Sequence, residues 1–245
     1  MRTDSSVRGW FVSLAAAGLL LAAGCGDGSD VPSASIPSPS GTGRATRSPG
    51  QDREEPVNLV ATDGEFRSPA QSDQELHPEV LISTSVGEFK VRLYWEQAPR
   101  TVANFLHNYV ETGFYDQTLM HYVESGYLIA GGGYDAELRE KATQPPIPCE
   151  ADNGLSNKRG TIAMARHPAF VNSATSQFFL NLVDNPGLDH QPGAGNGING
   201  YCVFGEVIEG MNVVDRIAHV PVHDKGELLN TPVTPVVIES VTRIK

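Results

Sequence analysis

The chain has 245 residues, of which 40% are hydrophobic, and it carries a formal net charge of −11. This length accommodates one generous domain with additional segments, or two small domains. The negative charge argues against nucleic acid as a partner, because binding to phosphates requires a cationic surface. The seven histidines show no metal-ligand spacing, and the sequence contains no motif for nucleophilic hydrolysis or phosphate binding.

Residues 1–25 have the features of a signal peptide. Arg2 and Arg8 give a positive start, and an apolar run follows at 10–23. That run is shorter than the about 20 residues that span a bilayer, but it suits the hydrophobic part of an export signal. Small residues before Cys25 resemble a lipobox, which predicts lipidation of Cys25 and a membrane anchor. An ordinary secretory signal is the alternative, and either interpretation predicts an exported protein of the cell envelope or periplasm.

Residues 26–77 are interpreted as a flexible linker rich in Ser, Pro and Gly. Between residues 26 and 56, these three types account for 16 of 31 residues. A segment of this composition buries too little apolar surface to offset the entropy that it loses on ordering. The sequence therefore predicts that the folded domain begins near residue 78 and extends to residue 245.

The pattern of the 78–245 segment predicts a mostly β domain. Residues 80–93 read as a hairpin with one buried face, and apolar spacing after Pro99 predicts a helix that ends near Gly113. A second helix is predicted at 211–218. Further strands are predicted at 118–123, 127–130, 161–165, 177–182, 201–207 and 236–244. Many short strands with only two helices favour a closed antiparallel barrel capped by those helices.

Two long loops, 131–160 and 184–200, contain glycines and are expected to form a binding groove. Glu150 and Asp152 in the first loop are interpreted as a charged cluster rather than as a catalytic pair. His190 and His223 are interpreted as solvated loop residues.

Two cysteines, Cys149 and Cys202, follow the linker. In an oxidising compartment they could form a disulfide with each other. Cys202 lies in a strand-like run, so it could instead be a simple core residue. The sequence leaves both alternatives open.

Several segments, in order, resemble the cyclophilin family. Residues 118–132 read TLMHYVESGYLIAGG and are similar to the cyclophilin pattern T-x-F-H-R-V-x-x-G-F-M-x-Q-G-G. The blocks GTIAMAR (160–166) and ATSQFFLN (174–181) resemble the next two family blocks, and the match continues at 188–189, 201–205 and 207–211. The loop at 145–155 is similar to the periplasmic bacterial branch of the family. The resemblance covers about 165 residues without a break.

The resemblance implies an eight-stranded barrel with peptidyl-prolyl cis–trans isomerase (rotamase) activity in protein folding, without a cofactor or metal. Rotation of an X–Pro bond is slow because amide resonance imposes a barrier of about 18–20 kcal/mol. In cyclophilins an arginine donates a hydrogen bond to the prolyl nitrogen of the twisted amide, a glutamine supports it, and an apolar pocket holds the proline ring. The expected partners are proline-containing segments of unfolded or exported proteins, and we expect a monomer.

Residue by residue, the resemblance assigns catalytic positions to Tyr122, Ala130, Arg166 and Gln177. The substrate-binding positions that it implies are Tyr127, Leu128, Ala165, Phe179, Leu188 and Tyr201. For Phe179 and Leu128, a role as ordinary core residues is the alternative.

The sequence departs from the family pattern at four positions, one of which is Met120 in place of a phenylalanine. Tyr122 stands where the family has its arginine, Ala130 where it has its glutamine, and Gly187 where it has Trp or Phe. One hypothesis is an isomerase with weakened catalysis, which uses Tyr122 or a swung-in Arg166 as its donor. Another is a binding module or chaperone that holds proline-containing segments without much turnover. A purely structural envelope protein is the third interpretation.

Overall fold

The computed structural model describes residues 77–192 and 199–245. The predicted signal peptide, Cys25 and the linker up to residue 76 lie outside the described residues. In the described part of the chain, no helix is long and apolar enough to cross a membrane.

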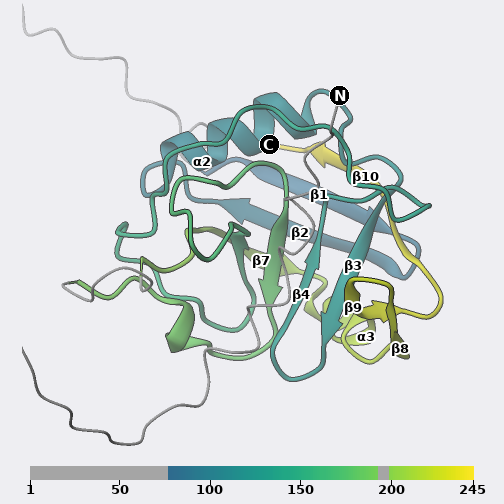
Figure 1. The fold of residues 1–245 in the computed structure, drawn as a ribbon. Coiled ribbons are helices and arrows are strands. Elements are labelled where there is room, and N and C mark those ends of the chain that lie inside the picture. The colour runs from purple at the N-terminus through teal and green to yellow at the C-terminus, as the bar shows by residue number, and fades with distance from the viewer. Residues whose placement is uncertain (1–76, 193–198) are drawn as a thin grey trace, which may run out of the picture. The chain divides into compact units, whose positions relative to one another are not determined.

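Eight antiparallel strands close into a barrel in the order β1-β10-β3-β4-β6-β5-β7-β2 (Figure 1), which confirms the predicted fold class. The first and last strands of the domain pair with each other, so that β10 closes the barrel between β1 and β3. The barrel strands are β1 (Glu79–Thr84), β2 (Gly87–Leu93), β3 (Thr118–Glu124), β4 (Leu128–Gly131), β5 (Thr161–Met164), β6 (Phe178–Asn181), β7 (Val203–Glu209) and β10 (Val236–Arg243).

The two predicted helices are present. The first begins as α2 (Pro99–Ala103) and continues as the π-helix η2 (Asn104–Val110), while the second is α3 (Met211–Ile217). The Glu150 carboxylate accepts hydrogen bonds from the backbone N–H groups of Arg100, at 3.1 Å, and Thr101, at 2.8 Å. The first N–H groups of a helix have no partner inside the helix. Glu150, from a loop distant in sequence, therefore supplies the hydrogen-bond acceptor for these two N–H groups of α2. A short 3-10 helix, η3 (Pro186–Leu188), lies in the second long loop.

Aromatic rings fill the barrel core. The ring centroid of Phe105 lies 5.3 Å from that of Tyr115 and 5.2 Å from that of Phe204. Phe89 from β2 and Ile82 from β1 are also fully buried in this core. Apart from Tyr115, which lies in the turn between η2 and β3, these side chains come from strands and from the first helix, as the alternating and helical spacing of the sequence predicts.

A second hairpin was not anticipated in the region after α3. It consists of β8 (Val222–Lys225) and β9 (Leu228–Pro232), and β9 lies against β3. Every residue of β8 is exposed, so this strand lacks the apolar alternation that marks a half-buried strand in sequence. His223 is therefore exposed, as expected, but it lies on a strand rather than in a loop.

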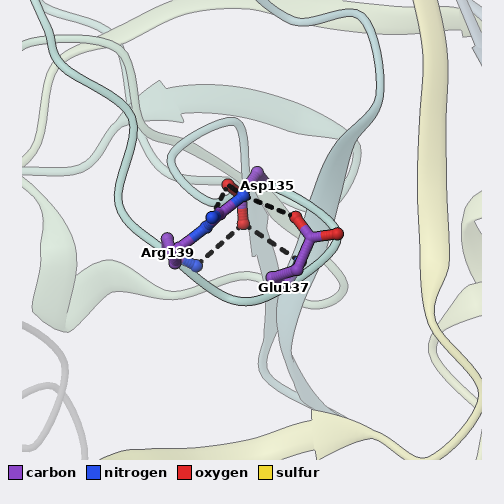
Figure 2. A network of polar contacts seen from close by, with 3 residues as sticks. All are labelled: Asp135, Glu137 and Arg139. Carbon is purple, nitrogen blue, oxygen red and sulfur yellow. Dashed lines mark hydrogen bonds and ion pairs between the residues drawn. The ribbon is translucent and has the colours of Figure 1, made fainter.

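The turn after β4 packs beside this hairpin. Asp135 accepts hydrogen bonds from the backbone N–H groups of Glu137 and Arg139 and from the Arg139 guanidinium (Figure 2). The backbone N–H of Arg139 contributes most to holding the pKa of Asp135 below its usual value. Leu138 from this turn, together with His121 of β3 and hairpin residues, lines a small cavity of about 50 Å³.

Candidate functional site

The barrel pairing places residues from four neighbouring strands in one row. Tyr122 of β3 is opposite Ala130 of β4, which is opposite Phe179 of β6, which is in turn opposite Ala163 of β5. These residues lie up to 57 positions apart in the sequence but belong to one apolar cluster, separate from the aromatic core. The row thus joins the position of the family arginine to the predicted proline pocket.

This second cluster brings together most of the predicted site. The resemblance implied ten site residues, and eight of them belong to the cluster or pack against it: Tyr122, Tyr127, Leu128, Ala130, Ala165, Phe179, Leu188 and Tyr201. Three other members, Ala163, Leu155 and Val203, come from elements already predicted. Leu229 of β9 is the unforeseen member, since nothing in the sequence indicated that the second hairpin reaches this face.

The walls of the predicted proline pocket are closed. Phe179 is 1% exposed and Leu128 is 0% exposed. Tyr127, Tyr201 and Leu229 are only partly buried and pack against this cluster. A proline ring can therefore contact Phe179 and Leu128 only after some of the covering side chains move aside.

The Tyr122 hydroxyl is already engaged in hydrogen bonds. It donates to Oε2 of Glu124 at 2.5 Å, and it also interacts with the side chain of Asn230 from β9. Burial, followed by the hydrogen bond to Glu124, raises the pKa of Tyr122 well above its usual value. Tyr122 therefore stays protonated at neutral pH. Glu124 lies two residues after Tyr122 on the same strand, and residues i and i+2 of a strand share a face, so this contact could have been predicted from the sequence. Asn230 lies far along the chain, and no sequence pattern indicated its contact with Tyr122.

Arg166 is held at the edge of the site. Its guanidinium lies 4.8 Å from the centre of the Tyr201 ring. It also donates hydrogen bonds to three backbone carbonyls: those of Gly200 at 2.8 Å, His167 at 3.0 Å and Pro168 at 3.2 Å. Rotation of Arg166 into the groove would break all three bonds. The arrangement therefore favours Tyr122 over a swung-in Arg166 as the donor.

Gln177 offers an acceptor beside the cluster. Its side chain is 5% exposed and packs against Gly133, where an added Cβ would lie 2.5 Å from Gln177 Cγ. Within residues 77–192 and 199–245, the Gln177 Oε1 atom has no hydrogen-bond partner. A buried acceptor without a partner costs about 1–3 kcal/mol, so a peptide N–H would gain from bonding to it.

The remaining polar candidates serve structural roles. Glu150 caps α2 rather than pairing with Asp152 as a carboxylate dyad. Among the described residues, no group of three or more His, Cys, Asp or Glu side chains could hold a metal ion. Cys202 is 4% exposed and belongs to the aromatic core cluster, so the interpretation of Cys202 as a core residue is confirmed. Both Cys149 and Cys202 are free thiols in this structure.

Comparison with known proteins agrees with the geometry. Residues 79–243 match the family described as cyclophilin type peptidyl-prolyl cis-trans isomerase/CLD. The chain is 46% identical over 166 residues to peptidyl-prolyl cis-trans isomerase A of Dickeya dadantii, which covers 68% of this chain and 84% of that protein. It is also 46% identical over 163 residues to peptidyl-prolyl cis-trans isomerase B of Escherichia coli, covering 66% of this chain and 98% of that protein.

Solved structures show the same barrel. A cyclophilin type peptidyl-prolyl cis-trans isomerase of Cryptosporidium parvum superposes with a TM-score of 0.56 at 25% identity, over 69% of this chain and 98% of that one. The same protein solved in the presence of the dipeptide Ala-Pro superposes with a TM-score of 0.55. The family match over the whole barrel and the 46% identity to two bacterial enzymes lead to one assignment. The chain belongs to the cyclophilin family and is a peptidyl-prolyl cis-trans isomerase.

Proposed function

We propose that this isomerase acts on X–Pro bonds of exported proteins with weakened catalysis, and that the Tyr122 hydroxyl is its hydrogen-bond donor. The observation that carries the proposal is the row in which Tyr122 and Phe179 are separated by one strand and share one apolar cluster. A proline ring against Phe179 would place its nitrogen on the side of the pocket where Tyr122 lies.

The chemistry requires one donor at that place. As the amide twists, the prolyl nitrogen becomes pyramidal and a better acceptor, so a donor stabilises the twisted form more than the planar one. Tyr122 supplies a neutral donor, and neutral hydrogen bonds are about half as strong as charge-assisted ones. Ala130 supplies no polar group. The weaker donor and the missing glutamine are the reasons for expecting slower turnover than in relatives that have both groups.

A second candidate function is a module that binds proline-containing segments with little turnover. The Glu124 carboxylate favours it, because it already accepts a hydrogen bond from the Tyr122 hydroxyl, which is the candidate donor. In this case Gln177 and Phe179 would hold the peptide, and Tyr122 would act only as part of the pocket wall.

The expected location is also part of the proposal. The apolar run at 10–23 and the small residues before Cys25 support export and anchoring by lipidated Cys25, with residues 26–77 as a tether. Clients would then be exported chains near the membrane.

The experiment compares wild type with Tyr122→Phe in a proline-isomerisation assay, together with a titration of an Ala-Pro peptide. Loss of one neutral donor should lower kcat/KM by about tenfold, since each 1.36 kcal/mol is worth a factor of ten. Peptide affinity should stay within about twofold, because the donor acts on the twisted amide. Thermal unfolding of both proteins controls for the loss of the Glu124 bond.

Two results would contradict the proposal. Equal kcat/KM in the two proteins would show that Tyr122 is not the donor. Peptide binding by wild type without measurable turnover would establish the binding module instead.

A further inference from the structure

Three buried asparagines lie next to the predicted proline pocket. Asn157 is in the loop before β5, Asn181 is the last residue of β6, and Asn185 directly precedes η3. These residues are 1%, 0% and 7% exposed, respectively. A buried amide costs stability unless hydrogen bonds satisfy it, so the partners of these side chains show what the asparagines do.

The three side chains bond to one another in series and are called the amide chain below. Asn185 Nδ2 donates to Asn181 Oδ1 at 2.8 Å, and Asn181 Nδ2 donates to Asn157 Oδ1 at 3.2 Å. Asn181 Nδ2 also donates to Thr161 Oγ1 of β5 at 2.9 Å. The backbone N–H of Asn185 donates to the carbonyl of Asn157 at 2.8 Å, which adds a second link between the two ends.

The ends of the amide chain hold the backbone of the pocket rim. Asn185 Nδ2 donates to the carbonyl of Tyr127 at 3.1 Å. Asn157 Nδ2 donates to the carbonyls of Leu188 at 3.0 Å and Tyr201 at 3.4 Å. Tyr127, Leu188 and Tyr201, called the rim residues below, all belong to the apolar cluster of the pocket or pack against it.

Two further contacts fix the Asn157 end. Oδ1 of Asp189 accepts hydrogen bonds from the backbone N–H of Asn157 at 2.6 Å and from its Nδ2 at 3.0 Å. The carbonyl of Leu188 also accepts the backbone N–H of Tyr201 at 2.9 Å, so these two rim residues are tied to each other. The Tyr201 ring in turn stands edge-on to that of Phe179, with centroids 5.6 Å apart. The position of the rim therefore shapes the pocket directly.

We propose that the asparagines of the amide chain are positioning residues for substrate binding, which fix the backbone of the rim residues before a proline ring enters. The inference rests on the proposed proline pocket, but it does not depend on Tyr122 being the donor. Walls that are ordered on folding need not be ordered on binding, and this raises affinity. Without the amide chain the rim would sample other arrangements, and the apparent affinity would fall with the fraction of molecules that can bind.

The effect should appear in substrate affinity rather than in turnover. The pocket walls contact the proline ring whether the amide is planar or twisted, so they contribute equally to binding of the ground state and of the transition state. Loss of such uniform binding raises KM and leaves kcat unchanged.

The test is a titration of the full chain with an Ala-Pro peptide. Asn157→Ala removes the donor to two rim carbonyls, and its Kd should rise by about fivefold, the scale of one hydrogen bond in an equilibrium constant. Asn185→Ala removes the donor to Tyr127 only and should give a smaller rise; it is the second variant in case Asn157→Ala fails to fold. Isomerisation kinetics of the same variants should show a raised KM with kcat within about twofold of wild type.

The matched control is Asn104→Ala. Asn104 is also buried, at 4% exposed, and its Nδ2 donates at 2.9 Å to the carbonyl of Thr175, which lies outside the pocket cluster. This variant should lose stability in thermal unfolding but bind the peptide as wild type does. An equal loss of affinity in Asn104→Ala and Asn157→Ala would overturn the proposal, because general destabilisation would then explain both.

Wild-type affinity in folded Asn157→Ala and Asn185→Ala would also overturn it. Phe179→Ala in the same titration separates this failure from failure of the pocket. If only Phe179→Ala binds weakly, the pocket stands and the amide chain serves the fold alone. If all three variants bind as wild type does, the predicted pocket is wrong as well.

Discussion

Replacing Glu124 with glutamine should make this isomerase faster, although it removes an ionised group from the site. In the structure the Tyr122 hydroxyl donates a hydrogen bond to the Glu124 carboxylate at 2.5 Å, so the hydroxyl must give up this bond before it can donate to a prolyl nitrogen. A hydrogen bond to a charged acceptor is worth about 1.5–3 kcal/mol, and a neutral bond about 0.5–1.5 kcal/mol. In Glu124→Gln, the free-energy cost of breaking the Tyr122 hydrogen bond before the hydroxyl donates to the substrate should therefore be lower by about 1 kcal/mol.

That difference corresponds to about a fivefold increase in kcat/KM, because each 1.36 kcal/mol is worth a factor of ten. The assay is isomerisation of an Ala-Pro peptide by wild type, Glu124→Gln, Tyr122→Phe and the double variant. Glu124→Gln should have no effect in the Tyr122→Phe background, since the competition acts only through the hydroxyl. A slower Glu124→Gln enzyme would refute this reasoning, because Glu124 would then be positioning Tyr122 rather than competing with the substrate.

Three further predictions follow from the pocket, the buried histidine and the N-terminus. Phe179→Ala should weaken Ala-Pro peptide binding by about 1–3 kcal/mol, and a titration with unchanged affinity would mean that the pocket lies elsewhere. Burial lowers the pKa of His121 to about 4. Between pH 6.5 and pH 4 the unfolded chain therefore binds a proton at this histidine that the folded chain does not. The free energy of unfolding should fall by about 3 kcal/mol as the pH is lowered over that range. Denaturant unfolding should show a smaller loss in His121→Gln, and an equal loss in both proteins would contradict that origin. Wild-type protein should fractionate with membranes and Cys25→Ala should not; recovery of both in the soluble fraction would exclude the anchor.

The barrel itself was predictable from local pattern. Alternating apolar residues, as in β2, and helical spacing after Pro99 depend on the period of each element, and period is a property that sequence displays directly. The second hairpin escaped prediction because β8 is exposed at every residue and has no apolar face to reveal it. The domain boundaries at residues 25 and 77 stay predictions, since they fall at or beyond the edge of the described residues.

The sequence by itself indicated which residues belong to the predicted site, because Tyr122, Ala130 and Phe179 each lie inside a recognisable block. Only the tertiary structure decided what these residues touch. Barrel closure sets the register that aligns them in one row, and register depends on pairing between strands that are far apart in the chain. The contacts of Asn230 with Tyr122 and of Arg166 with three carbonyls likewise arise from long-range packing, for which no short segment carries a signal.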